Sequence, residues 1–279
     1  MKKILAAFDG LKFSQSTADY AIYIARLINA HLVGVFLDDF TRHSYKIYDL
    51  MHVEGGANDA TMRALDNEDK ELREAATAQF RSVCHEAGIE FSIHHDRNIA
   101  IQELLKESNF ADLLIIDAKE TITHFTENPP TRFIKDLLAH VKCPVLLVPP
   151  AFEPIRKNVL LYDGEANSVF AIKSFSYLLE PLTRVKTELV TVNSKDDSKS
   201  LPNNRLLREF MKYHFPDTHY TLLKGLADIE IIDHLRNKHE HELIVLGAYN
   251  RGALSRWLKP SVAESLMHEI KSPIFISEN

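Results

Sequence analysis

Two aspartates, Asp9 and Asp163, each follow a short apolar run and precede a glycine. In sheets of parallel strands, ligands bind at the carboxyl ends of the strands, so a carboxylate at such an end can contact a ligand. Asp-Gly after a strand is also a common turn, in which the carboxylate accepts backbone N–H groups. For Asp163 both interpretations have equal weight. For Asp9 we favour the turn.

A loop of the same length occurs once in each half of the chain, after the predicted fourth strand. Pro130 lies thirteen positions after Asp117 and is followed by Thr131. Pro260 lies thirteen positions after Gly247 and is followed by Ser261. Each proline-hydroxyl pair precedes a helical pattern, so Thr131 and Ser261 are predicted helix N-caps. The halves also begin alike, with KKILAAFDG at residues 2–10 and RKNVLLYDG at 156–164. The chain therefore contains one fold unit twice.

Each unit alternates apolar strands with amphipathic helices. Predicted strands in copy one are 3–8, 31–37, 89–94, 113–116 and 145–148, and predicted helices begin at Ser14 and span 68–88, 99–108 and 132–141. Copy two repeats this order with strands 158–162, 186–192, 218–223, 243–246 and 274–276, and helices 168–179, 203–213, 228–238 and 261–270. This alternation predicts an α/β fold with two doubly wound, five-stranded parallel sheets, in domains 1–150 and 151–279, with helices on both faces.

Copy one is longer than copy two between its first and fourth strands, by 24 residues. The surplus is predicted in an excursion over residues 38–69. It is either a plain surface excursion, which we favour, or a lid over a site, since long loops are functional or disordered.

Composition argues against a nucleic-acid or membrane partner. The 279 residues carry a net charge of −6 and no apolar run near the roughly 20 residues that span a bilayer. We expect no nucleic-acid or membrane partner, because such a partner calls for a basic surface. The N-terminus has no signal-peptide pattern, which predicts a cytoplasmic protein.

Other chemistry receives little support. The 14 histidines include no His-Glu-x-x-His spacing, and the adjacent His94 and His95 point to opposite faces of a strand, so we expect no metal site. Cys84 and Cys143 are predicted buried thiols. No catalytic motif is present, so no catalytic residue is assigned, and we expect no enzyme.

Three features of each copy resemble those of a tandem universal stress protein: the strand-one aspartate, the loop after strand four and the final strand that follows Lys-x-Pro. The resemblance covers nearly the whole chain. The resemblance implies flavodoxin-like, Rossmann-like domains that pair through their last strands, here 145–148 against 274–276, as an intramolecular pseudo-dimer. It also implies ATP or another adenine nucleotide as cofactor, and a role in stress response.

Nucleotide-binding members of that family carry G-x2-G-x9-G-[ST] after strand four, where glycines let backbone N–H groups approach phosphates. Copy two matches in part: it keeps Gly247 and Ser261, replaces the other glycines with Asn250 and Pro260, and adds Arg251 and Gly252. The resemblance implies that the nucleotide contacts are Asp9, Asp163, Gly247, Asn250, Arg251, Gly252 and Ser261. Because two of the three motif glycines are replaced, we expect the site to bind more weakly than in the family.

Copy one has Asp117 and Glu120 in place of the first two glycines, and like charges near a phosphate are repulsive. The resemblance therefore implies a non-catalytic stress-response protein that senses an adenine nucleotide through its second domain. The alternative is an interaction protein without a nucleotide, whose protein partner is unidentified. A further homodimer remains open in either case.

Overall fold

The computed structural model describes residues 1–39, 59–123, 125–193, 201–236, 241–247, 266–269 and 271–278. They divide into two compact units, of which unit 1 comprises 1–127 and 131–142, and unit 2 comprises 128–130 and 143–279. The break at residue 142 assigns the strand at 145–148 to unit 2. The two domains that we predict, with a boundary at residue 150, stay a prediction.

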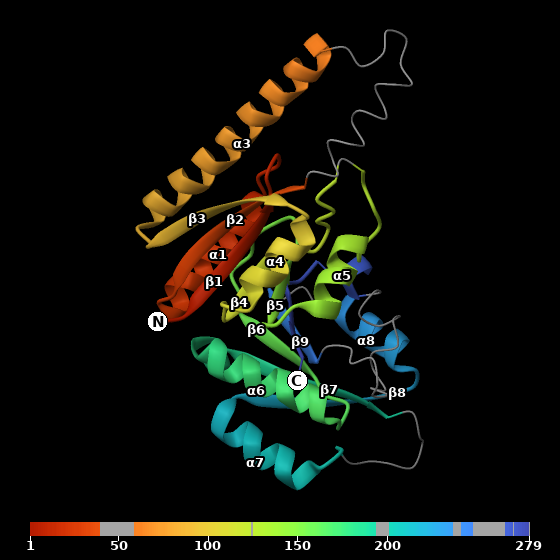
Figure 1. The fold of residues 1–279 in the computed structure, drawn as a ribbon. Helices are drawn as coiled ribbons and strands as arrows, with labels where there is room; N and C mark the ends of the chain where they lie inside the picture. The colour runs from red at the N-terminus through yellow and green to blue at the C-terminus, as the bar shows by residue number, and fades with distance from the viewer. Residues whose placement is uncertain are drawn as a thin grey trace. The chain divides into compact units, whose positions relative to one another are not determined.

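Unit 1 contains four parallel strands in the order β3-β2-β1-β4 (Figure 1). Its elements are β1 (Lys3–Asp9), α1 (Gln15–Ile28), β2 (His31–Asp39), α3 (Asp59–Ala87), β3 (Phe91–Asn98), α4 (Ala100–Ser108), β4 (Leu113–Asp117) and α5 (Arg132–His140). The strands β1, β2 and β4 are almost entirely buried, which explains their continuous apolar sequences.

Unit 2 repeats this order as β8-β7-β6-β9-β10, with all neighbours parallel. Its elements are β5 (Val145–Val148), β6 (Lys157–Leu161), α6 (Ala166–Leu178), the 3-10 helix η1 (Glu180–Arg184), β7 (Lys186–Asn193), α7 (Asn204–His214), β8 (Thr218–Lys224), α8 (Ala227–Arg236), β9 (Glu242–Gly247) and β10 (Ile274–Ser277). The strand β5 pairs antiparallel with β10, with Phe275 opposite Leu146, which confirms the predicted pairing of the last strands.

Helices cover both faces of the unit 1 strands, with α1 beside α3 and α4 beside α5. In unit 1, Phe80 of α3 lies against Gly34 of β2, where a Cβ on the glycine would lie 2.6 Å from the phenyl ring. The phenyl rings of Phe8 and Phe36 pack against the same Phe80 ring. The helix α4 carries Glu107, which contacts Lys3 across the opposite face. The α/β fold class is confirmed.

Several predicted boundaries were wrong. The helix α3 begins at Asp59 rather than residue 68, so helix occupies part of the predicted excursion. Residues 59–68 include Ala60, Ala64 and Leu65, which favour helix. The rest of the excursion, residues 40–58, lies outside the described residues, and the lid stays a prediction. In copy two α6 begins at Ala166, two residues early, and η1 was not predicted.

Helix starts in copy one follow the predicted caps. The Ser14 hydroxyl accepts a hydrogen bond from the Thr17 backbone N–H at 3.3 Å, and α1 begins at the next residue. The Thr131 hydroxyl likewise accepts from Ile134 N–H at 3.2 Å at the start of α5. Each cap satisfies a donor that the first helical turn leaves without an intrahelical partner.

Candidate functional site

Asp163 and Gly247 lie at the carboxyl ends of two neighbouring strands. Leu160 of β6 pairs with Val245 of β9, so the residues that follow them along each strand reach the same edge of the sheet. From β6 the chain continues through α6 to β7 on one side, whereas β9 lies on the other side of β6. This reversal of strand order is the topological switch point, where doubly wound sheets bind ligands.

Asp163 is buried and organises the turn into α6. Its Oδ1 accepts hydrogen bonds from the Glu165 backbone N–H at 2.9 Å and from the Ser168 hydroxyl at 2.6 Å. Gly164 between them has φ +88°, a left-handed conformation that glycine adopts without steric cost. The turn interpretation of Asp163 is therefore observed. A contact with a ligand stays a prediction.

Gly247 is placed where no side chain fits. A Cβ there would lie 2.7 Å from the carbonyl carbon and oxygen of Asn167, and 3.0 Å from the backbone nitrogen of Ser168. The first turn of α6 thus packs directly on the end of β9. From the sequence, Gly247 is predicted to let backbone N–H groups come close to a phosphate. The structure shows that Gly247 also allows α6 to pack on β9.

The other predicted copy-two contacts are Asn250, Arg251, Gly252 and Ser261. All four lie outside the described residues. Their approach to Asp163 and Gly247 stays a prediction.

Copy one also has an aspartate that accepts a backbone N–H group in the turn after its first strand. Asp9 is 2% exposed and its Oδ1 accepts the Leu11 backbone N–H at 3.0 Å, which matches the turn that we favoured. Asp117 accepts from Lys119 N–H at 2.8 Å through its Oδ1. Glu120 Oε1 accepts the backbone N–H groups of Thr121 and Ile122, both at 2.9 Å.

These three acidic side chains interact electrostatically at one strand edge. Burial is the main cause that raises the pKa of the Glu120 carboxyl, and the nearby charges of Asp9 and Asp117 raise this pKa further. The two backbone N–H groups lower it in part. The switch point of copy one is thus unfavourable to a further negative charge, as its sequence predicts.

The whole chain is similar to known universal stress proteins. The curated Universal stress protein Slr1230 from Synechocystis sp. is 21% identical over 289 residues, which cover 98% of this chain and 99% of that protein. A universal stress protein from Archaeoglobus fulgidus has a TM-score of 0.68 at 14% identity, over 99% of this chain and 98% of that one. The chain is thus similar to a universal stress protein in sequence and shares the fold of another, in each case over nearly its whole length.

A second solved structure agrees. It is a Pseudomonas aeruginosa protein described as a universal stress protein, with a TM-score of 0.57 at 16% identity over 100% of this chain and 93% of that one. No family model matches the chain. The predicted resemblance to a tandem universal stress protein is confirmed.

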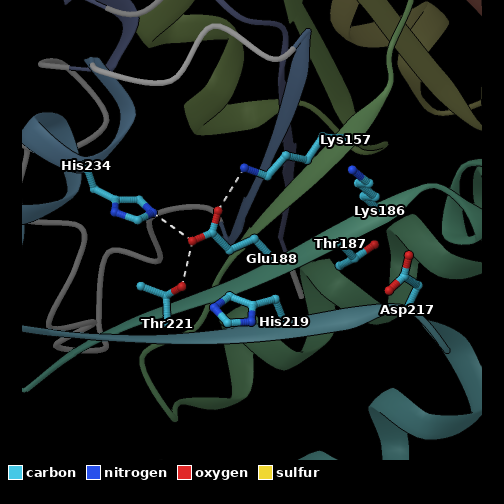
Figure 2. Close-up of a pocket in the computed structure, with 8 residues that line it drawn as sticks. All are labelled: Lys157, Lys186, Thr187, Glu188, Asp217, His219, Thr221 and His234. Atoms are coloured by element: carbon cyan, nitrogen blue, oxygen red, sulfur yellow. Dashed lines mark hydrogen bonds and ion pairs between the residues drawn. The ribbon is translucent and has the colours of Figure 1, made fainter.

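In unit 2, a buried ionic network that sequence reasoning missed lies near the amino-terminal ends of the strands (Figure 2). Lys157 Nζ lies 2.9 Å from Glu188 Oε2 and 3.0 Å from Glu242 Oε1. Glu188 Oε1 accepts the Thr221 hydroxyl at 2.6 Å and lies 2.8 Å from His234 Nε2. The sequence feature that could have indicated the network is Glu188, a charged residue within the apolar strand β7.

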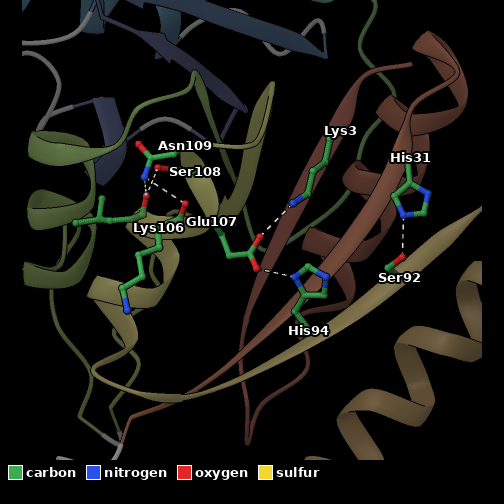
Figure 3. A network of polar contacts seen from close by, with 9 residues as sticks. Lys3, His31, Ser92, His94, Lys106, Glu107, Ser108 and Asn109 are labelled. Atoms are coloured by element: carbon green, nitrogen blue, oxygen red, sulfur yellow. Dashed lines mark hydrogen bonds and ion pairs between the residues drawn. The ribbon is translucent and has the colours of Figure 1, made fainter.

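Copy one carries a related network at the equivalent edge (Figure 3). Lys3 precedes Asp9 by six residues, as Lys157 precedes Asp163. Its Nζ lies 3.2 Å from Glu107 Oε2, whose Oε1 lies 2.6 Å from His94 Nδ1. Here the carboxylate comes from the helix and the histidine from the strand. In copy two the helix supplies the histidine, and a strand supplies the carboxylate.

The two networks differ in burial. The side chains of Lys157 and Glu188 are 10% and 5% exposed, against 29% and 20% for Lys3 and Glu107. Charge pairs away from water are screened less by solvent and salt. We therefore expect removal of one partner to cost more stability in copy two than in copy one.

Metal and thiol chemistry find no support in the part of the chain that the structure describes. Within it, no three side chains of His, Cys, Asp and Glu form a group that could hold a metal ion. Cys84 and Cys143 are both buried, as predicted, and burial raises the pKa of the Cys84 thiol to about 12. Within the same residues, no helix has both the length and the apolar character needed to cross a membrane.

Proposed function

We propose that the protein is a non-catalytic stress-response protein that senses an adenine nucleotide, bound at the switch point of copy two. The observation that supports this proposal is the placement of Asp163 and Gly247 on neighbouring strands, beside the first turn of α6. The family motif that the sequence partly retains begins at this Gly247. Its later residues, Arg251 and Ser261, would supply a cation and a hydroxyl donor to the phosphates.

The two copies are proposed to differ in function. Copy one has Asp117 where copy two has Gly247, and its Glu120 carboxyl has a raised pKa because of burial and the neighbouring acids. A triphosphate there would meet like charge in a partly desolvated crevice. Copy one is accordingly proposed to leave nucleotide binding to copy two.

Mass spectrometry of the purified, gently denatured protein tests whether a nucleotide is present. Co-purified ATP, ADP or AMP supports the sensor. A nucleotide-free spectrum, together with no heat on titration with ATP, contradicts it. That result would favour the alternative of an interaction protein without a nucleotide. The exposed side chains of Tyr177 (60%), Tyr213 (78%) and Leu206 (61%) on α6 and α7 favour this alternative.

Titration calorimetry on variants tests the assignment to copy two. Arg251→Met should weaken ATP binding, and Asp117→Gly in copy one should leave it unchanged. Gly247→Asp should abolish binding, but Gly247→Ala is needed beside it. Any Cβ at residue 247 meets Asn167 within 2.7 Å, so the alanine variant reports the steric part alone. Full ATP affinity in Gly247→Asp would overturn the assignment.

A further inference from the structure

The helices α6 and α7 of unit 2 carry large apolar side chains that are exposed to solvent. They are Val169 and Tyr177 on α6, and Leu206 and Tyr213 on α7. The members of the α6 pair are eight residues apart and those of the α7 pair are seven apart, so each pair lies along one side of its helix. Each helix therefore has an exposed apolar stripe about two turns long.

Aromatic contacts join the two stripes. The ring centroid of His214 on α7 lies 5.5 Å from that of Tyr177 and 4.3 Å from that of Phe210, which is one turn earlier on α7. The first of these contacts places α6 and α7 side by side, as Figure 1 shows. The helix α6 connects β6 to β7 and α7 connects β7 to β8, and these strands are parallel, so the two helices run in the same direction.

The contact between Tyr177 and His214 also sets the register of the two helices. Two turns before these residues stand Val169 on α6 and Leu206 on α7, so the two stripes lie next to each other along their length. The result is one apolar surface that spans both helices. We call it the α6–α7 surface, and it comprises Val169, Tyr177, Leu206, Phe210, Tyr213 and His214.

Positive charge borders the α6–α7 surface. The two helices carry four cations and one anion, Glu209, and the exposed Glu165 directly before α6 reduces the net charge to +2. The exposed residues just beyond the carboxyl ends of the helices add two charges of each sign, Arg184, Lys186, Glu180 and Asp217. Among the described residues, no carboxylate forms an ion pair with any of the four helix cations, which are Lys173, Arg205, Arg208 and Lys212. On a chain of net charge −6, this surface is thus locally complementary to an acidic partner.

The corresponding helices of copy one, α1 and α3, lack this combination. Within their described residues, α1 has no exposed large apolar side chain and α3 has only Leu72. Together α1 and α3 carry five cations and eight anions, a net charge of −3. The repeated fold therefore does not require a basic apolar surface on this pair of helices, and the α6–α7 surface is a property of copy two. An exposed apolar patch with a polar border is typical of an interaction site.

We propose that the α6–α7 surface binds an acidic amphipathic helix of a partner protein. Apolar side chains at positions i, i+4 and i+7 of that helix span two turns, the length of the two stripes, and pack on the exposed tyrosines. Its acidic side chains lie beside Lys173, which stands midway along the α6 stripe, and beside Arg205 and Lys212, which directly precede the two exposed residues of the α7 stripe.

Charge argues against two other occupants. A second copy of the chain that presented the same surface would bring like charges together. A nucleic acid or an anionic bilayer would meet the four helix cations but also the net charge of −6 on the whole chain.

Fluorescence anisotropy with a labelled synthetic peptide tests the proposal on the full-length protein. The probe is a helix of about four turns, with Leu at positions i, i+4 and i+7 and Glu on both flanks. Its counterpart has Lys in place of each Glu. The Glu peptide should bind at least tenfold more tightly than the Lys peptide, and its affinity should fall with added salt.

Variants locate the binding. Leu206→Ser and Tyr213→Ser should each weaken binding of the Glu peptide about tenfold, the loss expected when an interface anchor is truncated. Ile229→Ser on α8 is the matched control, because Ile229 is 52% exposed but lies outside the α6–α7 surface. It should leave binding unchanged. All three side chains are exposed, so urea unfolding of each variant should match that of the parent.

Several results would overturn the proposal. They are equal binding of the Glu and Lys peptides, no binding of the Glu peptide at millimolar concentration, and equal losses for Leu206→Ser and Ile229→Ser. A parent protein that self-associates while Tyr213→Ser stays monomeric would show that a second copy covers the surface. Binding to phosphatidylserine vesicles that Tyr213→Ser abolishes would show a membrane site instead. The peptide titrations contain no nucleotide, so their outcome is independent of the proposed sensor site.

Discussion

Gly247 and Asn167 meet through their backbones alone. The position of a Cβ on Gly247 lies 2.7 Å from both the carbonyl carbon and the carbonyl oxygen of Asn167. Asn167 is in the first turn of α6, and Gly247 is the last residue of β9. The helix can approach the sheet edge this closely only because residue 247 has no side chain. In copy one the equivalent residue is Asp117, so this close approach is a property of copy two.

Gly247→Ala should destabilise the protein by about 1–3 kcal/mol, the cost of forcing extra volume into a packed contact. Urea unfolding, followed by circular dichroism, measures the change. Asp117→Ala is the matched control in copy one, where a Cβ is already present. It loses the Lys119 hydrogen bond but also removes a charge that is unfavourable to ionised Glu120, so its cost should be about 1 kcal/mol or less. Equal losses in the two variants would contradict the steric role of Gly247.

Lys157→Met should destabilise the protein by about 3–5 kcal/mol, because it leaves Glu188 and Glu242 buried without their shared cation. The matched change in copy one is Lys3→Met, where the ion pair is more exposed. Its cost should be about 1 kcal/mol or less. Urea unfolding of both variants and the parent measures the two losses in the free energy of unfolding. A Lys157→Met protein as stable as the parent would exclude the proposed role of the network.

The copy-two network should make stability depend on pH in the acid range. Burial by itself would raise the pKa of Glu188, but hydrogen bonds from Thr221 and Lys157 and the charges of Lys157 and His234 outweigh it and lower this pKa from 4.5 to about 2. Because the folded-state pKa is the lower one, the unfolded state binds more protons between these values. The stabilisation is complete above pH 4.5 and is lost as the pH falls toward 2.

Unfolding midpoints in urea between pH 6 and pH 2.5 measure this dependence. Thr221→Val removes one hydrogen-bond donor to Glu188, so it should raise the pKa of Glu188 and move the acid loss of stability to higher pH. Thr218→Val on the same strand is the control, because its hydroxyl donates to Phe215 instead. Identical acid profiles for the parent and Thr221→Val would contradict this account.

Glu120→Gln in copy one should stabilise the protein at neutral pH. Burial and the neighbouring Asp9 and Asp117 raise the pKa of Glu120, so the folded state favours its protonated form and ionisation works against folding. The neutral glutamine avoids that cost, and its oxygen can still accept the N–H groups of Thr121 and Ile122. The difference in stability between variant and parent should grow from pH 4 to pH 7. A difference that stays constant with pH would show that charge is not the cause.

Much of the fold follows from local pattern. Buried parallel strands read as continuous apolar runs, so β1, β2, β4 and their copy-two counterparts were predicted within two residues. The helix starts at Ser14 and Thr131 were also predictable from local sequence, because a cap side chain accepts a backbone N–H group only three residues away. The beginning of α3 was missed because its first turns lack a strong apolar periodicity, although the residues favour helix.

The candidate site was predictable only in part. Asp9, Asp163 and Gly247 were identified from their positions after strands, and the structure places Asp163 beside Gly247 at the switch point. The second role of Gly247, its contact with Asn167, was not predictable, because the two residues are 80 positions apart and meet only when α6 packs on β9.

The sequence by itself determined the duplication, the order of strands and helices, and the difference in charge between the loops after the fourth strands. Each of these depends on residues that are neighbours along the chain or are repeated at a fixed spacing. Only the tertiary structure decided that Lys157, Glu188, His234 and Glu242 form one network. They come from four different elements, and the register of the parallel strands, with α8 packed beside β7 and β8, brings each charge within 2.8–3.0 Å of a partner in the network.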